Sequence, residues 1–161
     1  MASVRCTGSS WLTSGVGVVL LFIAATPIGA GAADVKLAVI THPQNTVDSV
    51  TPRKLKQLFT AQLLFWPSGS PVVALNYPAG AGLRVAFDRA VLGMGPDRVG
   101  EFWVDQLVRA RARPPRKLPN ARLMLRVVAQ LKGSVGYVPV ERLTADVKVL
   151  ATIRGGKVVP K

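Results

Sequence analysis

Glycine and alanine fill a short stretch of the sequence between an apolar run and an amphipathic pattern. Residues 77–82 read Tyr-Pro-Ala-Gly-Ala-Gly. Small residues let backbone N–H groups approach a ligand, and a helix start adds unpaired donors and partial positive charge, so an anion such as phosphate or sulfate would be stabilised there. By pattern alone, an ordinary glycine-rich connection is the commoner meaning. The candidate ligand contacts are Asn76, Gly80, Ala81, Gly82, Leu83 and Arg84.

His42 is the only histidine, so a histidine-rich metal site is excluded and a Ser-His-Asp triad would have to use this residue. It precedes Pro43 at the exit of an expected strand, and no Gly-x-Ser-x-Gly motif is present. We interpret His42 as a structural residue that caps a loop. The sequence therefore predicts a protein that is not an enzyme, with no catalytic residue, metal or other cofactor.

Acidic and aromatic residues also invite a functional interpretation. Three acids repeat every four residues: Asp97, Glu101 and Asp105. Arginines at helical spacing from them favour a solvated stripe over a site of paired carboxylates. Three aromatic residues lie in apolar runs, which favours core positions over a stacking platform; they are Trp66, Trp103 and Tyr137.

Residues 109–126 carry seven positive charges and no acid, a composition that suits polyphosphate backbones. No nucleic-acid motif accompanies the charges, and aromatic residues are not interleaved with them. We therefore expect a solvated basic face and no nucleic-acid partner. Contact between this face and an anionic membrane surface stays open.

The patterns that must position these residues alternate between strand and helix. Strands are expected over 34–40, 72–75, 134–138 and 146–150, and helices begin at Pro52, Leu83, Pro96 and Asn120. Thr51 is expected to cap the first helix and Gly93 to end the second. The apolar residues expected to face inward are Val99, Phe102, Trp103, Leu107 and Ala110 on the third helix and Leu123, Val127, Val128 and Leu131 on the fourth. The order of strands and helices predicts an α/β fold whose sheet is at least partly parallel, with helices packed on its faces. Ligands in such sheets bind beyond the carboxyl ends of strands, which directs attention to the loops 42–51 and 76–83.

The first 33 residues have the features of a secretory signal peptide: Arg5, an apolar run over 16–25, and small residues at 30–33. That run is about ten residues long, whereas a retained membrane anchor needs roughly 20. The expected organisation is a signal peptide over 1–33, one domain over 34–150 and a loose basic tail over 151–161, in the periplasm or secreted. The only cysteine, Cys6, lies in the signal segment.

Cleavage would remove Arg5 and no acid, so the formal net charge of +13 becomes +12. A charge of this size favours an anionic partner, although it does not distinguish a phosphate ion from a polyanion or a membrane surface.

Five ordered segments resemble the periplasmic phosphate ABC-transporter substrate-binding proteins, and more narrowly their short single-lobe members. The segments are 41–45, 58–59, 65–72, the loop and helix 78–87, and 132–138. The resemblance covers nearly the whole chain from about Val35 to Leu150. It implies a type II periplasmic-binding-protein-like lobe with three α/β/α layers and a mixed sheet, which recognises a solute or anion outside the inner membrane.

Two departures from the family pattern affect the expected affinity. Full-length receptors of this group close two lobes around the ion, and this chain has room for one. They also place a Ser-Gly-Thr group, preceded by an arginine, where this chain has Ala81-Gly82-Leu83 with Asn76 upstream. Each hydrogen bond to a charged group contributes roughly 1.5–3 kcal/mol, so losing the hydroxyl donors predicts weak binding.

The leading hypothesis is an exported solute-binding or accessory protein that binds a small, phosphate-like oxyanion weakly, with a membrane transporter as partner. The alternative is a non-catalytic basic interaction module that binds anionic envelope polymers or a partner protein. A third hypothesis, an envelope hydrolase that uses His42, has little support in the sequence.

Overall fold

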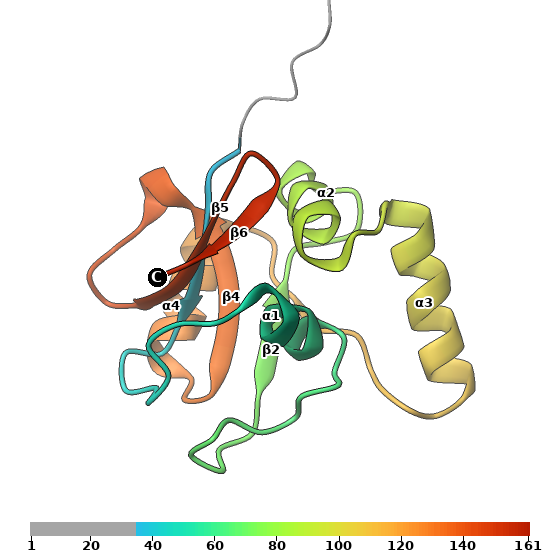
Figure 1. Cartoon of the computed structure of the whole chain (residues 1–161), viewed down its shortest axis with the longest axis horizontal. Coiled ribbons are helices and arrows are strands. Elements are labelled where there is room, and N and C mark those ends of the chain that lie inside the picture. The colour runs from blue at the N-terminus through green and yellow to red at the C-terminus, as the bar shows by residue number, and fades with distance from the viewer. Residues whose placement is uncertain (1–34) are drawn as a thin grey trace, which may run out of the picture. The chain divides into compact units, whose positions relative to one another are not determined.

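A six-stranded mixed sheet forms the centre of residues 35–161, which are the residues that the structure, a computed structural model, describes. The expected signal segment 1–33 lies outside these residues. The strands run in the order β3-β2-β4-β1-β5-β6 across the sheet (Figure 1). They are β1 (Leu37–Thr41), β2 (Val73–Asn76), β3 (Arg116–Lys117), β4 (Ser134–Pro139), β5 (Lys148–Arg154) and β6 (Lys157–Pro160).

The sheet is parallel on one side and antiparallel on the other. β2 pairs in parallel with both β3 and β4, whereas β1 is antiparallel to β4 and β5, and β5 is antiparallel to β6. β1 is completely buried, as its near-continuous apolar sequence predicts for a strand covered on both faces. The mixed α/β sheet expected from the sequence is therefore confirmed.

Helices cover both faces of the sheet, and two neighbouring residues of β4 show how. The helices are α1 (Pro52–Phe59), α2 (Gly82–Phe87), which continues into the π-helical η1 (Asp88–Leu92), α3 (Pro96–Val108), α4 (Ala121–Gln130) and the short η2 (Val140–Arg142). A Cβ at Gly136 would meet Met124 of α4, whereas the next residue, Tyr137, stacks on Phe87 and packs near Phe59. Successive strand residues face opposite sides, so α4 covers one face and α1 and α2 the other.

Helix boundaries follow the local signals in the sequence. The hydroxyl of Thr51 accepts a hydrogen bond from the Lys54 N–H, and Pro52 occupies the first helical position of α1. Asn120 caps α4 in the same way, through the Leu123 N–H. Gly93 ends η1 in the left-handed conformation at φ 70°, as a C-terminal glycine should.

Three expectations about packing are wrong. Residues 151–161 are not a loose tail, because they form the end of β5 and all of β6. On α3, Leu107 is exposed instead of buried, because only the first half of that helix packs, through Val99 and Trp103. On α4, the buried stripe centres on Met124 and Val128, while Leu131, expected to face inward, is 38% exposed.

The strand directions separate the two loops that the sequence singled out. Thr41, at the end of β1, lies opposite Val135 near the start of β4, whereas β2 runs parallel to β4 and ends toward the other side. The loop after β1 and the loop after β2 therefore lie at opposite ends of the sheet (Figure 1). A single site cannot use both.

Candidate functional site

The glycine-rich loop joins the end of β2 to the start of α2. Gly80 has a φ of +84°, a left-handed conformation that favours glycine. The Ala81 N–H donates to the Pro78 carbonyl at 3.2 Å and is therefore already used. Within residues 35–161, the N–H groups of Gly80, Gly82 and Leu83 have no protein acceptor. Gly80 and Gly82 are exposed, so solvent or a ligand can reach this turn.

Below the loop, Asn76 belongs to a buried network with two tyrosines. Its side-chain oxygen accepts hydrogen bonds from the Tyr77 N–H and the Tyr137 hydroxyl. The Tyr77 hydroxyl donates to the Tyr137 carbonyl at 3.0 Å. Burial raises the pKa of Tyr77 to about 12 and raises the pKa of Tyr137 further, so both hydroxyls stay protonated. Only the NH2 group of Asn76 could donate to a ligand, because its oxygen is an acceptor.

Arg84 is buried in the first turn of α2 and is held by protein groups. Its Nε donates to Asp88 Oδ2 at 2.7 Å, and its Nη1 donates to the Tyr77 carbonyl at 3.0 Å. Both partners of the ion pair are nearly inaccessible, with side chains 9% and 5% exposed. Desolvation raises the pKa of Asp88 although Arg84 acts in the opposite direction. The charge of Arg84 is thus largely compensated within the protein.

A cavity of about 190 Å³ opens beside this loop, between α2, the first half of α3 and the segment before β3. Gly80 and Lys117 line it, as do the two members of the Arg84–Asp88 pair. The remaining wall is mainly apolar and includes Val85, Pro96, Val99, Trp103 and Pro114. The Asp88 Oδ1 atom has no hydrogen-bond partner among the residues described.

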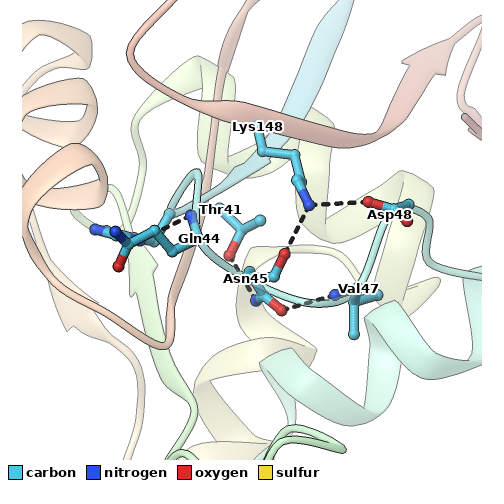
Figure 2. A network of polar contacts seen from close by, with 7 residues as sticks. Thr41, Gln44, Asn45, Val47, Asp48 and Lys148 are labelled. Atoms are coloured by element: carbon cyan, nitrogen blue, oxygen red, sulfur yellow. Dashed lines mark hydrogen bonds and ion pairs between the residues drawn. The ribbon is translucent and has the colours of Figure 1, made fainter.

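The other loop, 42–51, is held by its own side chains together with Thr41 of β1 and Lys148 of β5, as Figure 2 shows. Lys148 of β5 donates to the Asn45 carbonyl at 2.6 Å and to Asp48 at 2.8 Å, which holds the pKa of Asp48 below its ordinary value. Asn45 in turn bonds the hydroxyl of Thr41. His42 accepts a hydrogen bond from the Gln44 N–H through Nδ1, so its interpretation as a loop-capping residue is confirmed.

The structure brings the six predicted contact residues together around one turn, but in different environments. Gly80 and Gly82 are exposed, Ala81 and Leu83 are half-buried, and Asn76 and Arg84 are buried. The sequence interpretation missed Lys117, which belongs to a two-residue strand inside the basic stretch 109–126. It also missed the Arg84–Asp88 pair, for which the four-residue spacing of opposite charges was an available signal.

Other candidate residues take the roles that their patterns favoured. Trp66, Trp103 and Tyr137 are buried, which confirms them as core aromatics. The three acids at four-residue spacing are exposed, and Asp105 pairs with Arg109 at 2.6 Å. Across residues 35–161, no cluster of three or more His, Cys, Asp or Glu residues is placed to hold a metal ion. In that same range, every helix is too short or too polar to cross a membrane.

Comparison with known proteins identifies the fold. No protein-family model matches the chain, and neither does any curated protein. Among solved structures, an ABC-type phosphate transport receptor from Vibrio cholerae matches with a TM-score of 0.59 and 16% identity, over 74% of this chain and 46% of that one. PstS from Borrelia burgdorferi matches with a TM-score of 0.55 and 12% identity, over 73% and 47% of the two chains.

A third structure, from Clostridium perfringens, is described as a phosphate ABC-transporter substrate-binding protein with bound phosphate. It matches with a TM-score of 0.59 and 20% identity, over 74% of this chain and 45% of that one. The chain therefore spans less than half the length of these receptors. The resemblance inferred from the sequence is confirmed at the level of the fold, which is that of one part of such a receptor.

Proposed function

We propose that this protein is a non-catalytic, exported solute-binding or accessory protein that binds a small, phosphate-like oxyanion weakly at the start of α2. Backbone donors of Gly80, Gly82 and Leu83 provide the contacts, and the NH2 group of Asn76 and the remaining guanidinium donors of Arg84 assist. The Ala81 N–H donates to the Pro78 carbonyl, so Ala81 shapes the turn and does not donate to the ligand. A membrane transporter of the ABC type is the partner that the likeness suggests.

One observation carries this proposal: three backbone N–H groups without a protein acceptor gather at an accessible turn where a helical segment begins. Such groups attract anions, because the helix end adds partial positive charge to the unpaired donors. The net charge, +13 for the full sequence and +12 without residues 1–33, strengthens the attraction over longer distances. Weak binding follows from the absence of hydroxyl side chains at positions 81–83.

Gly82 offers a direct test, because proline can remove its N–H without disturbing the helix. Gly82 is the first helical residue, a Cβ there would meet nothing within 4 Å, and Ala81 before it has the extended ψ of 131° that precedes proline readily. We expect Gly82→Pro to weaken phosphate binding about tenfold or more in isothermal titration, because one charge-assisted hydrogen bond is lost.

The matched control is Gly82→Ala, which keeps the N–H and should bind phosphate like the unaltered protein. Sulfate is titrated in parallel, since a backbone site accepts both oxyanions. The absence of heat for phosphate and sulfate up to millimolar concentration would remove the proposal. Equal affinities for the proline and alanine variants would place the anion elsewhere.

The basic stretch 109–126 supports a second candidate function, an interaction module for anionic envelope polymers or membrane surfaces. All seven of its cationic side chains are exposed, and Arg109 is the one that has an ion-pair partner within residues 35–161. Binding to anionic vesicles or polysaccharide should weaken steeply as salt increases. Neutralising Arg111, Arg113 and Arg116 together should abolish it, whereas salt-independent binding would argue against this function.

A further inference from the structure

The cavity beside the glycine-rich loop is more apolar than an inorganic ion requires. Trp103, Val99 and Val85 form much of its wall, and Trp103 and Val99 are among the most buried residues of α3. Phosphate and sulfate are hydrated on every side and gain nothing from such a surface. A ligand with an apolar body would gain by removing both surfaces from water.

The charges around the cavity favour one anionic group. Arg84 and Asp88 form an ion pair with each other at 2.7 Å, so together they contribute no net charge. Lys117 is exposed at the cavity, and no ion pair within residues 35–161 involves it. The side chains that line the cavity therefore provide one uncompensated positive charge, close to the backbone of Gly80.

The size of the cavity fits a ring-sized body. Its volume is about 190 Å³, and an apolar protein cavity of about 150 Å³ is large enough to hold benzene. A phenyl-sized group could occupy the space between α2 and α3, while an anionic head stays at the mouth beside Gly80 and Lys117. An inorganic oxyanion would leave most of that space unfilled.

We infer that the ligand is a small organic anion, with one oxyanion head bound by Lys117 and the loop and an apolar body packed against Trp103. This inference rests on the proposed oxyanion-binding function and names its ligand class. Phenylphosphonate is a suitable probe, because it combines a phosphate-like head with a single ring. Inorganic phosphate, which has no apolar group, and methylphosphonate, which has only a methyl group, serve as the comparison probes.

Isothermal titration of the purified protein should rank the three probes by their apolar surface. We expect phenylphosphonate to bind at least about tenfold more tightly than phosphate, with methylphosphonate between them. Gly100→Leu tests the cavity directly, because Gly100 lines it and a Cβ there would meet nothing within 4 Å. The new side chain should fill the cavity, remove the preference for phenylphosphonate and leave phosphate binding unchanged.

Lys117→Gln should weaken all three probes by about tenfold, and Lys157→Gln, which removes an exposed lysine of β6, is the matched charge control. Equal affinities for phosphate and phenylphosphonate, or a Gly100→Leu variant that keeps the preference, would overturn the inference while the oxyanion proposal survives. Binding of none of the probes would overturn both. The folded state of each variant is checked by its urea unfolding midpoint.

Discussion

Arg84 and Asp88 hold opposite charges away from solvent, next to the loop on which the proposed function depends. Taking a guanidinium and a carboxylate out of water is expensive, and the pair compensates only if its geometry is good. The 2.7 Å contact and the additional bond from Arg84 to the Tyr77 carbonyl provide that geometry. Removing one partner would leave the other buried and uncompensated.

We therefore expect Asp88→Ala to lower the free energy of unfolding by about 3–5 kcal/mol. The double variant Arg84→Met with Asp88→Leu should lose less unfolding free energy than Arg84→Met alone or Asp88→Leu alone, because no charge remains to be desolvated. Urea unfolding followed by circular dichroism measures all variants. Additive losses in the double variant would show that the two side chains act independently.

The raised pKa of Tyr77 predicts that the free energy of unfolding falls at high pH. Its pKa rises from 10.0 to about 12 on burial, so the folded protein holds this proton more strongly than the unfolded chain. The resulting stabilisation is complete below pH 10 and is lost as the pH rises through 12. Tyr77→Phe should be less stable by about 1 kcal/mol at pH 8, through the lost hydrogen bond to Tyr137.

The difference in unfolding free energy between the unaltered protein and Tyr77→Phe should then shrink above pH 10 and reverse in sign before pH 12, because a rise in pKa from 10.0 to about 12 outweighs a hydrogen bond of about 1 kcal/mol. Burial raises the pKa of Tyr137 further still, so its hydroxyl keeps its proton over this range and the comparison reports mainly on Tyr77. Urea midpoints at four pH values over this range are sufficient. A difference that stays constant with pH would mean that Tyr77 ionises in the folded state as freely as in the unfolded chain.

At the scale of elements, two glycines have a positive φ but differ in the space around them, so replacing each one distinguishes the cost of backbone strain from the cost of a steric clash. Gly133, before β4, has φ +78°, and a Cβ there would lie 2.2 Å from the Pro71 carbonyl oxygen. Gly93, after η1, has φ +70° and open space around it. The Gly133 carbonyl also accepts bonds from the Trp66 indole and the Val73 N–H, which connects the turn 66–71 to the start of β4.

Gly93→Ala should cost about 1–2 kcal/mol, because only the left-handed conformation is penalised. Gly133→Ala should cost clearly more, because the backbone of Pro71 would have to move as well. Thermal and urea unfolding of the two variants provide the comparison. Equal losses would mean that the turn 66–71 adjusts freely to the added methyl group.

The starts of α1 and α4 and the end of η1 could be predicted from sequence because their signals are local. Thr51-Pro52, Gly93 and Asn120 act on their own neighbouring residues, and the structure confirms all three. The exposure of Leu107 could not be predicted, because helical periodicity identifies an apolar stripe and not the partner that covers it. β3 was missed because two residues carry no periodicity.

The candidate site was predictable in part for the same reason. The order of residues 76–84 shows a loop before a helix, and this is what the structure contains. The cavity depends on Lys117 and Trp103, which approach the loop only through the tertiary fold. Strand direction was also hidden, since the antiparallel placement of β1 results from pairing with residues almost a hundred positions away.

At the scale of the whole molecule, the last strand closes the sheet on its antiparallel side. β6 is antiparallel to β5, with Pro160 opposite Ala151 at one end and Lys157 opposite Arg154 at the other. β6 also contacts α1 and η1. Ending the chain at Arg154 should lower the unfolding free energy by about 1–3 kcal/mol, since four cross-strand pairs disappear. Urea unfolding and hydrogen exchange of β5 amides measure the effect. Unchanged exchange at Ile153 would show that β6 adds little.

The position of β1 in the sheet also determines when the protein can fold. Its neighbours β4 and β5 begin at residues 134 and 148, so its hydrogen bonds must wait until nearly all of the polypeptide has been synthesised. Pairings between residues so distant in sequence form slowly, because a long loop must close first. Until then a growing chain has no partner for its first strand, and the antiparallel half of the sheet forms only after synthesis is almost complete.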